Sequence, residues 1–155
     1  MGGGGGGGWN RLGDVRSLEQ KAREALAGGK KNVFISFAAE DMNEVNLLRA
    51  QAKNDNSDIE FNYHSVRAPY DSKRAEYIRE KISERIKRCS TTVVYLSDST
   101  AQSRWVKWEV EQSLKLGKAV IAVHAGAKYS GKKPEWLQKN GIKAVPWAKL
   151  ATKLK

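Results

Sequence analysis

The chain has 155 residues, of which 40% are apolar and 29% are charged. This length favours a single domain, and the composition is that of a globular protein rather than a disordered one. No apolar run approaches the roughly 20 residues that cross a bilayer, and Met1 is followed by glycines rather than by a signal-peptide core. We therefore expect neither a membrane span nor secretion.

The cysteine content and the charge indicate the cellular compartment and the kinds of partner to expect. Cys89 is the only cysteine, which excludes an internal disulfide and a thiolate zinc cluster and favours the reducing cytoplasm. The net charge is +11, and the segment from Gln112 to Lys155 holds ten lysines against one acidic residue. Such a surplus could hold a nucleic acid, but no arginine–aromatic interleaving or nucleic-acid motif accompanies it. We interpret it as a solvated lysine surface and expect no nucleic-acid partner.

The first 30 residues differ from the rest. Residues 1–13 are predicted to form a flexible, glycine-rich leader, and residues 14–29 a short helix ended by Gly28 and Gly29. The glycine run follows no strand and no Gly-Lys-Ser/Thr sequence closes it, so it is not a phosphate-binding loop. The regular domain is expected to span residues 30–155.

Five stretches of that domain are typical of strands. Short apolar runs at 33–37, 92–96 and 119–123 indicate strands buried on both faces, residues 59–66 alternate, and 143–147 form a short last strand. Helical patterns lie between them, with Ile78, Ile82, Ile86 and Cys89 on one face of the segment 73–88. Alternating strands and helices predict a parallel sheet with right-handed crossovers. The expected fold is flavodoxin-like, three-layered, with strand order 2-1-3-4-5.

In such a sheet, ligands bind beyond the carboxyl ends of the strands, where the strand order reverses. Here that edge comprises the loops 38–41 and 97–104. Phe37 could stack on a base or belong to the core. Asp41 could contact a ribose, but we favour a helix N-cap, with Glu44 completing a capping box.

Ser103 is a predicted N-cap of a helix that ends before Gly117, and the segment that follows it carries the strongest chemical signal. Placed on a helix at about 100° per residue, Glu109 falls inside the apolar arc, between Trp105 and Val106, whereas Glu111 falls on the polar face. A carboxylate in an apolar arc is costly unless it is bonded, paired or facing a cavity, and desolvation raises the pKa of such a group. Either Glu109 faces a ligand, or it is tied to Arg104, an N-cap hydroxyl or a backbone amide.

At these residues the chain resembles a TIR-like domain of the bacterial kind found in Thoeris-type antiphage systems. Three stretches carry the resemblance: 33–41 (VFISFAAED), 93–100 (VVYLSDST) and 103–109 (SRWVKWE). The last matches the family's Trp-Cys-x-x-Glu pattern, with Val106 in place of the cysteine. The match covers roughly residues 31–125.

The resemblance implies cleavage of the nicotinamide–ribose bond of NAD⁺, with Glu109 as the catalytic glutamate. It places the nucleotide pocket at the loop that includes Phe37, Ala38 and Asp41, with Trp105 as a further binding residue. It also places at 67–72 a mobile loop that contributes to the pocket and to self-association, with Arg67 as a binding residue of the pocket.

The expected activity is that of an NAD⁺ glycohydrolase or ADP-ribosyl cyclase in bacterial antiphage signalling. NAD⁺ would be a substrate rather than a resident cofactor, and the partners would be a second copy of the chain and a downstream effector that senses a nucleotide product. No metal is expected, because His64 and His124 lie in different strands without a clear carboxylate partner. The alternatives are a non-catalytic interaction module, a phosphoacceptor receiver, or a nucleic-acid-binding protein.

Overall fold

The computed structural model describes residues 31–54, 59–63 and 68–154. Described residues from Lys31 onward belong to one compact unit. The leader predicted at 1–13 and the helix predicted at 14–29 lie outside the described residues, as do Arg67 and His64. No helix among the described residues is long and apolar enough to cross a membrane.

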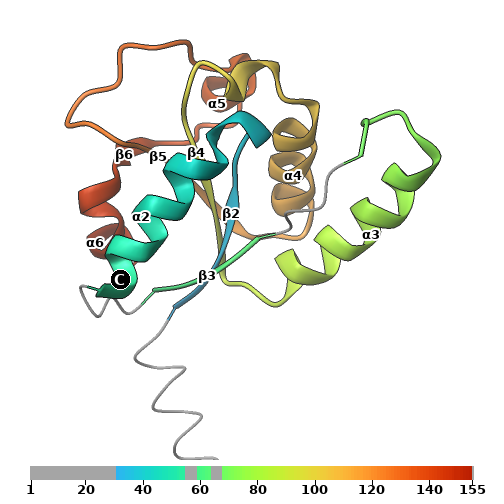
Figure 1. Cartoon of the computed structure of the whole chain (residues 1–155), viewed down its shortest axis with the longest axis horizontal. Coiled ribbons are helices and arrows are strands. Elements are labelled where there is room, and N and C mark those ends of the chain that lie inside the picture. The colour runs from blue at the N-terminus through green and yellow to red at the C-terminus, as the bar shows by residue number, and fades with distance from the viewer. Residues whose placement is uncertain (1–30, 55–58, 64–67, 155) are drawn as a thin grey trace, which may run out of the picture. The chain divides into compact units, whose positions relative to one another are not determined.

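The centre of the unit is a five-stranded sheet in which every strand pairs in parallel with its neighbours. The spatial order is β3-β2-β4-β5-β6, which confirms the predicted order 2-1-3-4-5 (Figure 1). Its strands are β2 (Lys31–Ser36), β3 (Ile59–Asn62), β4 (Thr91–Tyr95), β5 (Ala119–His124) and β6 (Ala144–Pro146). The expected extension of the second strand to residue 66 is wrong at Tyr63, which lies outside the strand.

Helices cover both faces of the sheet, which gives the predicted three layers. Figure 1 shows α2 and α6 on one side and α3 and α4 on the other, with α5 near the upper end. The helices are α2 (Met42–Asn54), α3 (Lys73–Lys87), α4 (Arg104–Lys115), α5 (Glu135–Lys139) and α6 (Leu150–Lys153). Short 3₁₀ turns are η1 (Ala39–Asp41), η2 (Thr100–Gln102) and η3 (Trp147–Lys149). The sequence pattern did not predict α6.

Strand alternation decides which residues meet which helices, because successive side chains point to opposite faces of a sheet. Ile35 and Val93 pack with residues of α2 and α6, and Phe34 and Val94 pack toward α3, α4 and α5. The predicted apolar face of α3 is confirmed, and Cys89 continues it as a core residue with 2% exposure. Burial raises the pKa of the Cys89 thiol, which keeps it protonated and unreactive.

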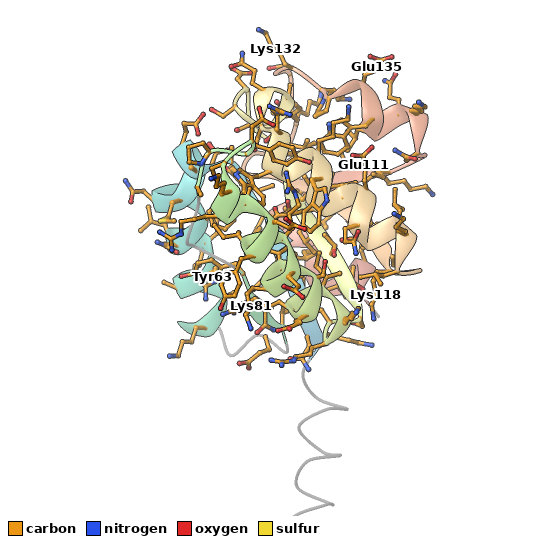
Figure 2. The ribbon with its side chains drawn as sticks, turned by 90° about the vertical axis from the view of Figure 1, so that its right-hand side faces the viewer. Tyr63, Lys81, Glu111, Lys118, Lys132 and Glu135 are labelled. Carbon is orange, nitrogen blue, oxygen red and sulfur yellow. The ribbon has the colours of Figure 1, made fainter. Side chains whose placement is uncertain are left out.

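The outer surfaces of α3 and α4 carry charge. Figure 2 shows Lys81 on α3 and Glu111 on α4 among the side chains that face away from the sheet. Most lysines of the segment from residue 112 onward are exposed, in agreement with a solvated surface. The candidate functional residues therefore lie in the loops and helix starts at the carboxyl edge of the sheet.

Candidate functional site

Glu109 is the central residue of the candidate site. It lies on α4, is 0% exposed, and accepts a hydrogen bond from the Ser36 hydroxyl, with 2.6 Å between Ser36 Oγ and Glu109 Oε1. Ser36 is itself fully buried and is the last residue of β2. The helix and the carboxyl end of a central strand therefore meet through a buried polar pair. The burial of Glu109 agrees with its predicted place in the apolar arc, whereas Ser36 was not among the predicted partners.

A side-chain cap begins α4, and a buried serine near its end holds the helix against the sheet. The Ser103 side chain accepts a hydrogen bond from the Val106 amide, which confirms the predicted N-cap. One turn after Glu109, the Ser113 hydroxyl donates to the Glu109 carbonyl at 2.7 Å and lies 2.7 Å from the Thr92 hydroxyl of β4. The backbone at Glu109 is thus tied to the sheet independently of its carboxylate.

Trp105 precedes Glu109 by one helical turn, and so lies on the same face of α4. Its indole is 9% exposed, and its N–H donates to the Ala68 carbonyl at 2.8 Å. The ring meets Tyr70 edge to face, with 5.3 Å between ring centroids, and Trp108 likewise at 6.3 Å. Trp105 therefore attaches the loop after β3 to the helix that carries Glu109.

Two arginines hold the same loop. Arg79 of α3 donates to the Tyr70 carbonyl at 2.9 Å and stacks on its ring, 4.3 Å from the centroid. Arg104 pairs with Asp71 and lies 4.4 Å from the Tyr70 centroid. The bond from Arg104 lowers the pKa of the Asp71 carboxyl. The alternative that tied Glu109 to Arg104 is not observed, since the recorded partner of Arg104 is Asp71.

Asp41 lies at the opposite side of the edge, just before α2, with 7% exposure. Its carboxylate accepts a hydrogen bond from the Ser97 hydroxyl, which comes from the loop after β4. Burial raises the pKa of Asp41, Ser97 opposes that rise, and Glu44 and Glu40 add to it. The predicted N-cap is wrong in its bonding: this carboxylate joins two loops of the sheet edge.

Phe37 and Ala38 are part of the core. Phe37 is 1% exposed and packs against Tyr63, with 5.7 Å between ring centroids. Ala38 is fully buried, and its carbonyl accepts the Asp41 amide at 2.9 Å. In this structure neither residue exposes a surface on which a base could stack. Of the two interpretations of Phe37, the packing agrees with the one that places it in the core.

The sequence reasoning missed Ser36 as a site residue. The signal was a small hydroxyl at the end of an otherwise apolar buried strand, directly below the loop 37–41. Of the two histidines, His124 is among the described residues: it is 6% exposed, and its Nδ1 lies 2.8 Å from the Gly126 carbonyl. Within the ranges that the structure describes, no group of three or more His, Cys, Asp or Glu is placed to hold a metal ion.

The fold and this edge define a TIR-like domain. A family model described as "Thoeris protein ThsB, TIR-like domain" matches residues 34–130, which is more than half of the chain. The chain therefore belongs to that family. A search of the curated proteins finds no match.

A solved TIR-domain structure has the same fold. The TIR domain of the Toll-related receptor TRR-2 from Hydra magnipapillata is similar, with a TM-score of 0.53 and 17% identity over 81% of this chain and 90% of that chain. Two weaker likenesses are the TIR domains of the activated Roq1 resistosome and the CMP N-glycosidase BcmB of Clostridium botulinum. Their TM-scores are 0.44 and 0.46, their identities 18% and 15%, and they cover 64% and 80% of this chain and 60% and 98% of theirs.

Proposed function

We propose that the protein cleaves the nicotinamide–ribose bond of NAD⁺, with Glu109 as the catalytic residue, in bacterial antiphage signalling. The observation that carries the proposal is a fully buried carboxylate, bonded to Ser36, at the carboxyl edge of the sheet in a member of a TIR-like family. Structural glutamates are rarely fully buried. A carboxylate kept at the ligand-binding edge of this fold is better explained by chemistry than by packing.

The reaction suits a single carboxylate. Nicotinamide leaves NAD⁺ as a neutral molecule, so no general acid is needed, and its departure leaves an oxocarbenium-like ribose. Glu109 would stabilise that positive charge, as carboxylates do in glycosidases. Water would then attack to give ADP-ribose, or an internal nucleophile would attack to give a cyclic product.

Ser36 would act as the positioning residue. Its hydroxyl donates to Oε1 of Glu109 at 2.6 Å, and both residues are on regular elements rather than on loops. A carboxylate fixed by a short bond and a rigid scaffold needs little reorganisation when charge develops next to it. The loop held by Trp105 and Arg104 would have to move for substrate to reach it, because Glu109 is fully covered.

The same burial supports one competing function, a non-catalytic interaction module. In that case Glu109 is a structural carboxylate, and the protein acts through self-association and an effector partner alone. Val106 in the cysteine position of the motif is compatible with this alternative.

Chromatography with mass detection of nicotinamide and its co-product tests the proposal, over a range of protein concentrations because self-association is expected. Wild type should release nicotinamide, and Glu109→Gln should lower the rate by about 100-fold or more. Glu80→Gln is the control, since Glu80 is an exposed glutamate on the helix α3 and lies outside the candidate site. Equal rates for wild type and Glu109→Gln, or no release at any concentration, would support the module instead.

A further inference from the structure

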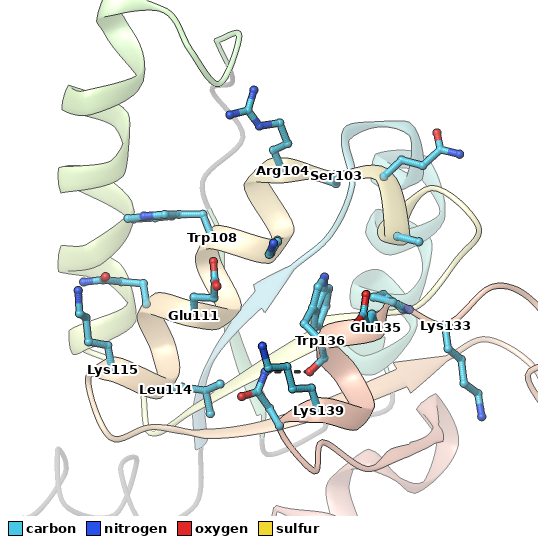
Figure 3. A pocket seen from close by; sticks show the side chains of 16 residues that line it. Ser103, Arg104, Trp108, Glu111, Leu114, Lys115, Lys133, Glu135, Trp136 and Lys139 are labelled. Atoms are coloured by element: carbon cyan, nitrogen blue, oxygen red, sulfur yellow. Dashed lines mark hydrogen bonds between the residues drawn. The ribbon is translucent and has the colours of Figure 1, made fainter.

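A second site lies on the outer side of α4. A surface cavity of about 1050 Å³ opens between α4 and α5, and its walls include Glu111, Trp108 and Trp136 but not Glu109 (Figure 3). It is therefore separate from the buried carboxylate. A volume of this order holds an organic ligand of nucleotide size rather than a single inorganic ion.

The charges in the cavity are mostly positive and mostly unpaired. Its walls hold five basic side chains against the carboxylates of Glu111 and Glu135. The salt bridges recorded between described residues, Lys81–Glu84 and Arg104–Asp71, involve none of its four lysines. Lys107 comes from α4 and Lys139 from α5, so the cavity has a cation on each side. The lining cations are Arg104, Lys107, Lys115, Lys133 and Lys139.

Trp136 gives the cavity an indole N–H donor on a largely buried side chain. Its side chain is 8% exposed and packs on the core, and Figure 3 shows its ring rising from α5 toward α4. The backbone carbonyl of Trp136 accepts the Asn140 amide at 2.8 Å, but no described residue accepts a hydrogen bond from its indole N–H. The indole of Trp105, in contrast, donates to Ala68. This N–H is open to the cavity and is therefore available to donate to a ligand there.

We infer that the α4–α5 cavity binds a nucleotide phosphate. The phosphates would meet Lys107 and Lys139, and a ligand oxygen would accept the Trp136 N–H. Glu111 and Glu135 would accept donors from ribose hydroxyls or a base amino group, which an inorganic phosphate lacks. The same carboxylates would repel the continuous phosphate backbone of a single-stranded nucleic acid. Exposed Leu114 and the half-buried ring of Trp108 offer apolar surface to a base.

Isothermal titration of the full chain with ADP tests this site, because ADP is neither substrate nor product of the proposed reaction. The double charge reversal Lys107→Glu/Lys139→Glu should weaken ADP binding by about tenfold or more. The matched control Lys149→Glu/Lys153→Glu changes the net charge equally at exposed lysines outside the cavity and should stay within about twofold. Thermal unfolding of each variant verifies that it is folded.

A conservative variant isolates the indole donor. Trp136→Phe keeps an aromatic ring, although a smaller one, and removes the indole N–H; it should weaken ADP binding about three- to tenfold. Trp147→Phe is its control, because Trp147 stacks on Phe61 at 5.3 Å and lies outside the cavity. Unchanged ADP binding in folded Trp136→Phe would remove the donor from the site and overturn the inference.

Further outcomes would also overturn it. One is the absence of binding heat when wild type is titrated with ADP at about millimolar concentration, and another is a Lys149/Lys153 control that loses as much affinity as the cavity variant. Inorganic phosphate as tight as ADP would indicate a simple anion site, and an eight-residue oligothymidylate bound more tightly than ADP would indicate a nucleic-acid surface. Loss of ADP binding in Glu109→Gln would place the ligand at the proposed catalytic site. Retained ADP binding in a Glu109→Gln variant that releases no nicotinamide supports both proposals separately.

Discussion

Two carboxylates on α4 contrast sharply although they are two residues apart. Glu109 is fully buried and bonded to Ser36, whereas Glu111 is exposed in the wall of the α4–α5 cavity. Two residues correspond to roughly 200° around a helix, so the sheet-facing side of α4 receives one and the solvent side the other. Residue type alone therefore does not identify a site here, because the position around the helix decides which glutamate meets the sheet.

The largest expected effect concerns the packing of the sheet-facing side. Trp105→Ala removes a ring that is 9% exposed, together with its bond to Ala68 and its contact with Tyr70, and should lower the free energy of unfolding by about 3–5 kcal/mol. Trp108→Ala, at a half-buried residue three positions along the helix, should lower the free energy of unfolding clearly less. Urea titrations of both variants measure the difference, and equal losses would mean that α4 does not have the two unlike sides described here.

A smaller loss is expected from the polar pair itself. Ser36→Ala removes the hydroxyl that donates to Glu109 and leaves the carboxylate less well bonded, which should cost about 1–3 kcal/mol. Glu111→Ala, on the exposed side, should stay within about 0.5 kcal/mol of wild type. If Ser36→Ala lowers nicotinamide release while Ser36→Thr restores it, the hydroxyl positions Glu109 rather than only filling space.

The helix start gives the next effect. Ser103→Ala removes the acceptor for the Val106 amide and should destabilise the protein by about 1 kcal/mol, and Ser103→Asp should retain most of the stability. Chemical unfolding of the three proteins gives the comparison. A Ser103→Asp variant as unstable as Ser103→Ala would show that the cap bond is not the source of the effect.

The sequence predicted the sheet order because buried parallel strands are short apolar runs with few alternative placements. It also predicted the phase of Glu109 and the cap at Ser103, which depend on local spacing. It did not predict the Ser36 bond or the Arg104–Asp71 pair, which join positions far apart in the chain. It assigned Asp41 to a local cap, because cap propensity is local whereas its partner Ser97 follows a different strand.

The smallest expected effect concerns the second polar pair of the sheet edge, Ser97 with Asp41. Here a substitution should raise the free energy of unfolding rather than lower it. The pKa of Asp41 is raised by burial and by the carboxylates of Glu44 and Glu40. A carboxyl whose folded pKa exceeds its unfolded value binds more protons when folded, so its contribution to stability falls as pH rises from the unfolded value through the folded one. Asp41→Asn keeps an acceptor for the Ser97 hydroxyl and removes that charge. It should therefore raise the free energy of unfolding slightly at pH 7, and the gain should shrink as pH falls through the raised pKa of Asp41 and be gone below about 4, where an ordinary aspartate is also protonated. Urea titrations at pH 7 and at acid pH check this, and a loss of stability at pH 7 would show that the ionised carboxylate stabilises the edge through its bond to Ser97.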